Sequence, residues 1–96
     1  MANRFEIVQY SPALKETLVE LQTHLWSSDR ALNAAYLEWK YERNPYSSEP
    51  LIWLAMDQAK AVGMRGVFAT KWQIGSPSHI LLIPYPDDLV IDPKCR

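Results

Sequence analysis

The chain has 96 residues, of which 48% are hydrophobic and 22% are charged, and its formal net charge at pH 7 is −1. This length suits a single domain over residues 1–96, and the composition excludes a disordered tail, a collagen-like repeat and a coiled coil. Lysine and arginine are scattered rather than gathered into a basic stripe, so we expect no nucleic-acid partner. The longest apolar run, Leu51–Met56, is too short to cross a bilayer, so we expect no membrane partner.

Cysteine usage and the first residues predict a cytoplasmic protein. The single cysteine, Cys95, cannot form an internal disulfide, whereas small secreted domains usually carry several. Residues 1–10 contain no apolar segment after a basic start, so they do not resemble a secretory signal. His24 and His79 have no partner at metal-ligand spacing, so we expect no metal site.

The first part of the chain predicts a short strand followed by a helix. Apolar residues within Arg4–Tyr10 indicate the strand. Ser11 is a favourable N-cap and Pro12 suits the first helical position. Leucines then recur at the spacing of one helical face, with acidic and amide side chains off that face. The leucines are Leu14, Leu18, Leu21 and Leu25, and the polar residues are Glu16, Glu20 and Gln22.

A second helix is expected between Asp29, as its cap, and the stop at Asn44-Pro45. The apolar spacing places one set of side chains on its inner face and leaves charged residues outside. The inner set is Leu32, Ala35, Tyr36 and Trp39, and the outer set is Arg30, Glu38 and Glu42.

The next segments predict a strand, a tight turn and a return strand. Leu51–Asp57 is apolar on both of its alternating faces, so this strand needs cover on both sides. Residues 57–60 form the turn, and Ala61–Gln73 returns. Within the return strand, Gly63 and Gly66 indicate a bulge or a close backbone approach.

The last third predicts a turn at residues 75–78 and an extended segment, His79–Ile83, as an edge strand or hairpin insertion. Pro84 and Pro86 interrupt the extended pattern after Ile83, and Asp88–Asp92 is predicted as a final strand.

The order strand, helix, helix, strand, strand, strand predicts an α+β fold with a mixed, mainly antiparallel sheet. Trp26, Trp53 and Trp72 are expected in the core. Two amphipathic helices can cover one sheet face, and no predicted element covers the other. We therefore expect a missing part or a partner on that face.

This element order and two short motifs resemble the N-terminal half of a GNAT-type acyl-CoA N-acyltransferase. The first motif is Tyr-Leu-Glu-Trp-Lys-Tyr at residues 36–41, followed by Asn-Pro-Tyr at 44–46. The second is residues 88–96, which resemble the family's fourth strand and the opening of its acyl-CoA motif, Arg/Gln-x-x-Gly-x-Gly/Ala. Arg96 would be the first residue of that motif. The resemblance covers the whole chain but about half of a typical family member.

The resemblance implies acetyl-CoA as acyl donor. In the family, glycine-rich backbone N–H groups bind the cofactor pyrophosphate, and of that loop this chain supplies at best Arg96. The pantetheine arm bonds to fourth-strand backbone, which here would be Leu89, Val90 and Ile91. One amide there would polarise the thioester carbonyl. The family's general acid lies in the C-terminal half.

The resemblance also implies an acceptor site. A carboxylate, often acting through water, takes a proton from the amine, and Asp88 and Asp92 are the positional candidates. Trp39, Tyr41 and Tyr46 would be walls of the site. Each residue also has a structural interpretation: core packing for Trp39, a turn or strand-end cap for the two aspartates, and solvation for Arg96.

Three functions are expected on these grounds. The complete protein would transfer an acetyl group to a small-molecule or peptide primary amine, with the 96-residue chain alone inactive. The chain would otherwise be a non-catalytic interaction or dimerisation module with half of the fold, forming a homodimer through its open face. A third interpretation is a ligand or peptide binder that uses residues 44–46 and 84–86.

Overall fold

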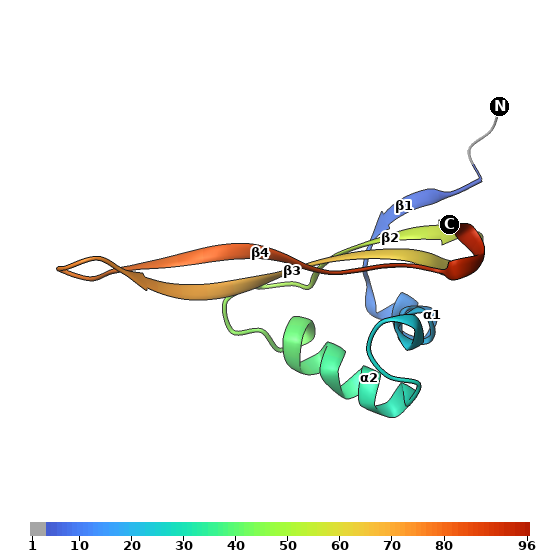
Figure 1. Ribbon diagram of the computed structural model, residues 1–96, viewed down its shortest axis with the longest axis horizontal. Coiled ribbons are helices and arrows are strands. Elements are labelled where there is room, and N and C mark those ends of the chain that lie inside the picture. Colours follow the sequence, from blue (N-terminus) through green and yellow to red (C-terminus); the bar gives the residue numbers. More distant parts are fainter. Residues whose placement is uncertain (1–3) are drawn as a thin grey trace.

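The computed structural model describes residues 4–96 and shows a four-stranded sheet with helices on one face (Figure 1). The strands lie in the order β1-β2-β3-β4, and each neighbouring pair is antiparallel. Their bounds are β1 (Glu6–Gln9), β2 (Leu51–Asp57), β3 (Lys60–Ile74) and β4 (His79–Ile91). This arrangement confirms the predicted α+β fold.

Two helical segments connect β1 to β2, and each changes its hydrogen-bonding pattern along its length. The first consists of a 3-10 turn η1 (Pro12–Leu14), the helix α1 (Lys15–Leu21) and a 3-10 turn η2 (Gln22–His24). The second consists of α2 (Arg30–Leu37) and a π-helical turn η3 (Glu38–Glu42). The Asp29 carboxylate accepts bonds from the backbone N–H groups of Ala31 and Leu32, which confirms the predicted cap.

The core lies between these helices and the sheet face that they cover. Leu18 and Leu21 enter it as expected, but Gln22 was placed wrongly on the outer surface. Gln22 is fully buried, and its amide donates to Met64 Sδ at 3.5 Å. Gln22 is the residue at which α1 passes into the 3-10 turn η2, so it lies outside the regular helical period used to place it. The main core side chains are Leu18, Leu21, Leu37, Tyr41, Ile52, Leu54, Met64 and Val90.

The second helical segment is rotated relative to its apolar pattern, so its predicted inner face was wrong. Asn33, Leu37 and Lys40 are buried, whereas Trp39 is 68% exposed. The inward polar groups have partners: Asn33 exchanges two hydrogen bonds with the backbone of Ser27. Paired polar groups can be buried, so the helix turns them inward and leaves aromatic residues outside. The outer apolar residues are Leu32, Tyr36 and Trp39.

β4 is one continuous strand through Pro84 and Pro86, where two separate strands were expected. Pro84 lies opposite Ala69 and Pro86 lies opposite Val67 in the β3 ladder. β4 is an edge strand, so a residue without an N–H is tolerated where its nitrogen points away from the neighbouring strand.

The distal part of the β3–β4 hairpin extends beyond the rest of the sheet (Figure 1). Pairing of β2 with β3 ends at Leu51 and Val67, and residues 68–85 continue as a two-stranded ribbon. Trp72 lies on this ribbon and is exposed, so its predicted core position was wrong. The other exposed apolar side chains of the ribbon are Ile74, Ile80, Leu81, Leu82 and Tyr85.

The sheet face opposite the helices is apolar and has no cover from residues 4–96, as the sequence predicted. We call it the open face and define it by Ile7, Trp53, Leu89 and Ile91, all of which are exposed. Trp53 was therefore also misplaced in the core, whereas Trp26 is half-buried against the core on the helical side.

Candidate functional site

A β-bulge interrupts the β3–β4 ladder where the sheet passes the end of the second helical segment. Arg65 lies opposite Leu89 and Gly66 lies opposite Asp87, which leaves Asp88 as the extra residue. Asp88 has φ 49°, in the left-handed region that an aspartate adopts more readily than most residues. Bulges redirect side chains and are frequent beside active sites.

The bulge directs the Asp88 carboxylate toward the helices, where it accepts three hydrogen bonds. Its Oδ2 accepts from Lys40 Nζ at 2.7 Å and from the Tyr41 hydroxyl at 2.6 Å. Its Oδ1 accepts from Trp26 Nε1 at 3.0 Å. Because the Asp88 side chain is only 9% exposed, these bonds replace its lost hydration.

Lys40 is the centre of the cluster. Its side chain is 6% exposed, and its Nζ also donates to Asp87 Oδ2 at 2.7 Å. Burial lowers the pKa of Lys40, but the hydrogen bonds to Asp87 and Asp88 outweigh burial, so the pKa is raised. The bond from Lys40 lowers the pKa of Asp87. The ammonium group lies 4.7 Å from the ring centroid of Phe68, a cation–π distance.

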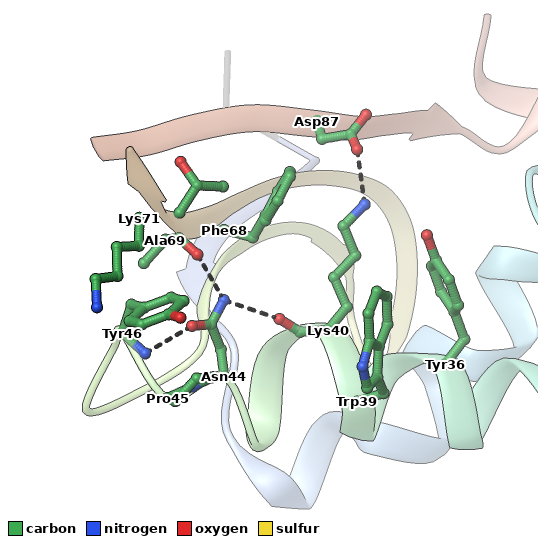
Figure 2. Close-up of a pocket in the computed structure, with 11 residues that line it drawn as sticks. Tyr36, Trp39, Lys40, Asn44, Pro45, Tyr46, Phe68, Ala69, Lys71 and Asp87 are labelled. Carbon is green, nitrogen blue, oxygen red and sulfur yellow. Dashed lines mark hydrogen bonds and ion pairs between the residues drawn. The ribbon is translucent and has the colours of Figure 1, made fainter. Parts of the chain in front are cut away.

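A pocket of about 420 Å³ lies above this cluster, between η3, the segment after it and the β3–β4 hairpin (Figure 2). This volume falls in the range of small-molecule sites, roughly 300–1,000 Å³. Aromatic side chains form much of its wall, and the charged pair Lys40–Asp87 lies at one side. The lining residues include Tyr36, Trp39, Tyr46, Phe68, Lys40 and Asp87.

Asn44 holds the pocket together. Its Nδ2 donates to the Ala69 carbonyl at 2.9 Å, and its Oδ1 accepts from the Tyr46 backbone N–H at 2.8 Å (Figure 2). These bonds fix the loop after η3 against β3. A π-helical turn carries Trp39 and Lys40 into the same pocket, and such turns are frequent at functional sites.

The structure brings together some of the sequence-predicted acceptor-site residues. Trp39 and Tyr46 line the pocket, while Tyr41 is buried behind it with its hydroxyl on Asp88. Asp92 is not among the pocket residues: its Oδ1 accepts from the Lys94 backbone N–H at 3.0 Å and caps η4 (Pro93–Cys95). That bond and the Lys60 ammonium outweigh burial and lower the pKa of Asp92.

The predicted pantetheine residues lie on an open strand edge. Asp92 N–H donates to the Val62 carbonyl across the ladder at 2.8 Å. Since backbone groups alternate in an antiparallel pair, those of Leu89 and Ile91 point away from β3. We call these outward groups the β4 edge. Arg96 Nε donates to the Ile91 carbonyl at 3.2 Å, and the Val90 side chain is buried in the core.

Sequence reasoning missed Lys40 and Asp87 as site residues. Lys40 belongs to neither the inner nor the outer set of the helical pattern, and its carboxylate partners lie 47 and 48 residues away along the chain. The sequence did contain one signal for this site, the adjacent carboxylates Asp87 and Asp88 between a proline-containing segment and an apolar strand. Two neighbouring carboxylates favour a cation beside them.

Searches against protein-family models, curated proteins and solved structures gave no match to this chain. Among residues 4–96 there is no cluster of His, Cys, Asp and Glu side chains suited to a metal ion. None of the helices in the described part of the chain is both long and apolar enough to cross a membrane.

Proposed function

We propose that the chain forms the N-terminal half of a GNAT-like N-acyltransferase domain, which in complete form transfers an acetyl group from acetyl-CoA to a primary amine. The observation that supports this proposal is the β4 edge. The backbone N–H and carbonyl of Leu89 and the N–H of Ile91 point away from β3 next to the bulge at Asp88, whereas the Ile91 carbonyl accepts from Arg96 Nε. An extended ligand arm could bond to this edge as an added strand does.

In the proposed reaction, the amine nitrogen attacks the thioester carbonyl carbon, a carbon–nitrogen bond forms and the carbon–sulfur bond breaks. An outward amide of the β4 edge would donate to the carbonyl oxygen as negative charge develops. A carboxylate takes the proton that the amine loses, for which Asp88 and Asp92 are the sequence-derived candidates. Asp88 is the nearer of the two to the pocket, but Lys40, Tyr41 and Trp26 already occupy its carboxylate, and Asp87 is the carboxylate that lines the pocket. The thiolate leaves and is protonated by a group outside these 96 residues.

A titration of isotope-labelled protein with acetyl-CoA, followed by nuclear magnetic resonance, tests the cofactor site. We expect selective shifts of the Leu89 and Ile91 amide signals with weak affinity, because the glycine-rich loop is not within this sequence. The amides of β1, at the opposite edge of the sheet, serve as the matched control. Unchanged Leu89 and Ile91 signals, or equal shifts at β1, would contradict the proposal.

Two simpler measurements bear on the same proposal. The coding sequence beyond the Arg96 codon should continue with the glycine motif and a helix, and a stop codon there would argue against an acyltransferase. The 96-residue chain alone should show no acetyl transfer. Turnover by the pure chain would show that the half-domain description is wrong.

A second candidate is a non-catalytic module that covers its open face with a partner, including a second copy. The observation that favours it is the exposure of Ile7 (68%) and Leu89 (55%) on one largely apolar surface, which also carries the exposed Arg65 between Trp53 and Leu89. Apolar patches of this kind usually mark an interface. Light scattering of the purified chain should then show a dimer or larger species. A monomer at high protein concentration would contradict self-association.

A further inference from the structure

The three charged groups beside the pocket do not balance. Lys40 carries one positive charge, while Asp87 and Asp88 carry two negative charges, so the trio has a net charge of −1. Asp88 is 9% exposed and is satisfied by Lys40, Tyr41 and Trp26. Asp87 is 46% exposed and lines the pocket. The excess negative charge is therefore accessible at Asp87.

The pocket wall beside this charge is aromatic and unusually exposed. Trp39 is 68% exposed, and Tyr46 and Tyr36 are 41% and 38% exposed. Tyr36 and Trp39 pack against each other with ring centroids 5.7 Å apart, so the two rings form one continuous aromatic wall. Aromatic faces attract cations and also provide apolar contact area.

We propose that this pocket binds a small organic ammonium ion with an apolar body. The ammonium group would pair with the Asp87 carboxylate, and the apolar body would lie against Trp39 and Tyr46. If the proposed acyltransferase function holds, this compound is the acceptor amine. Only its role as acceptor rests on the proposed function; the binding itself does not. The site would then select an apolar-bodied amine over a polyamine or an amino sugar.

The same geometry disfavours an anionic ligand. Lys40 is the buried cation of the site, and both of its carboxylate partners already neutralise it. Lys71 also lines the pocket and, like Asp87, is exposed, so solvent screens both charges; in Figure 2 its ammonium group lies on the other side of the pocket from Asp87. A carboxylate ligand bound beside Asp87 would therefore meet the net negative charge of the Lys40, Asp87 and Asp88 trio.

Calorimetric titration with phenethylamine, which is protonated at neutral pH, tests this proposal. The matched probes are 2-phenylethanol, which is neutral, and 3-phenylpropanoate, which is anionic. We expect phenethylamine to bind about tenfold or more tightly than either, since a charge-assisted bond to Asp87 is lost in both. Equal binding of the neutral probe, or tighter binding of the anionic one, would overturn the proposal.

Two variants locate the binding. Trp39→Ala removes an exposed side chain with little effect on folding and should weaken phenethylamine binding about fivefold or more. Trp53→Ala removes an exposed tryptophan from the opposite sheet face and should leave binding unchanged. Asp87→Asn should abolish the preference for phenethylamine over 2-phenylethanol, with thermal unfolding used to confirm that the variant is folded. Unaltered binding in Trp39→Ala, or an equal loss in Trp53→Ala, would place the ligand elsewhere.

These titrations contain no acyl donor, so their outcome is separate from the acetyl-CoA experiment. Failure of amine binding with intact shifts at the β4 edge would overturn the ammonium-binding proposal and leave the acyltransferase proposal standing. Amine binding without any β4-edge response would leave a ligand pocket and remove the acyltransferase proposal.

Discussion

The Tyr41 hydroxyl occupies the space that a side chain at Gly66 would need. A Cβ atom built on Gly66 would lie 2.1 Å from Tyr41 Oη and 2.7 Å from its Cζ. Gly66 therefore lets the η3 tyrosine cross β3 and reach the bulged Asp88. The close backbone approach indicated by this glycine in the sequence is confirmed, and it serves the charged cluster beside the pocket.

Gly66→Ala should destabilise the protein strongly. The new methyl group would overlap Tyr41, which is buried in the core and cannot move away without losing its bond to Asp88. Overpacking of this kind costs about 1–3 kcal/mol, and loss of the charged hydrogen bond adds to it. Gly63→Ala is the matched control, because its Cβ would meet Ala55 Cβ at 3.2 Å and the Val90 carbonyl oxygen at 3.8 Å, without the overlap found at Gly66. Urea unfolding that gives the same stability for Gly66→Ala and wild type would refute this packing.

Tyr41→Phe should lower the free energy of unfolding at neutral pH. It should also reduce the decline of that free energy at alkaline pH. The variant loses a hydrogen bond to a buried carboxylate, worth about 1.5–3 kcal/mol. Burial and the bond to Asp88 raise the pKa of Tyr41 above its value in the unfolded chain, about 10. The contribution of the Tyr41 hydroxyl to the free energy of unfolding is therefore fully present below about pH 10. It declines as the pH rises further, by up to about 1.4 kcal/mol per pH unit.

Unfolding measured from pH 8 to 11.5 checks this expectation. Tyr10→Phe is a parallel variant, because burial and Glu42 raise the pKa of Tyr10 as well. Each variant should flatten the decline of stability above about pH 10. An unchanged alkaline slope in both variants would mean that these hydroxyl groups are accessible to solvent in the folded protein.

Lys40→Met should cost about 3–5 kcal/mol, because it leaves a buried carboxylate without its opposite charge. Lys71→Met, at the exposed rim of the same pocket, should change stability by less than about 0.5 kcal/mol. Lys40 lowers the pKa of Asp87, so this contribution is present above about pH 4 and is lost as the pH falls. The difference between wild type and Lys40→Met should narrow in acid. Equal stability of the two lysine variants at pH 7 would contradict the role of the cluster.

The sequence predicted β1, β2 and β3, the helix cap and the close approach at Gly66 because each depends on neighbouring residues. Asp29 caps the first turn of α2 through residues within three positions of it, and the apolar residues of β2 indicate by themselves that this strand is buried in the sheet. It also predicted a sheet with one uncovered face, since two helices can cover only one side. These features depend on local patterns and on the count of elements.

The charged cluster was not predictable from the same patterns. Lys40 turns inward only because Asp87 and Asp88 meet it from a strand far along the chain. That pairing rotates the second helical segment and leaves Trp39 exposed, so apolar spacing gave the wrong inner face. Trp72 was misplaced for a different reason. β2 pairs with β3 only as far as Val67, so Trp72 lies beyond the sheet. The sequence of β3 alone does not show where its neighbour ends.

The distal β3–β4 ribbon should open locally far below the free energy of global unfolding. Beyond Val67 its strands pair only with each other, and most of its side chains are exposed. An uncovered two-stranded ribbon is marginally stable in water. In amide hydrogen exchange, residues 72–74 and 80–82 should therefore exchange orders of magnitude faster than residues 52–54 of β2. The comparison uses only amides that donate to a neighbouring strand, so that every amide compared is hydrogen-bonded in the sheet. Equal protection of the ribbon and β2 would contradict this expectation and would indicate that a second molecule covers the ribbon in solution. Dilution of the sample would then restore fast exchange, because a bound copy dissociates by mass action.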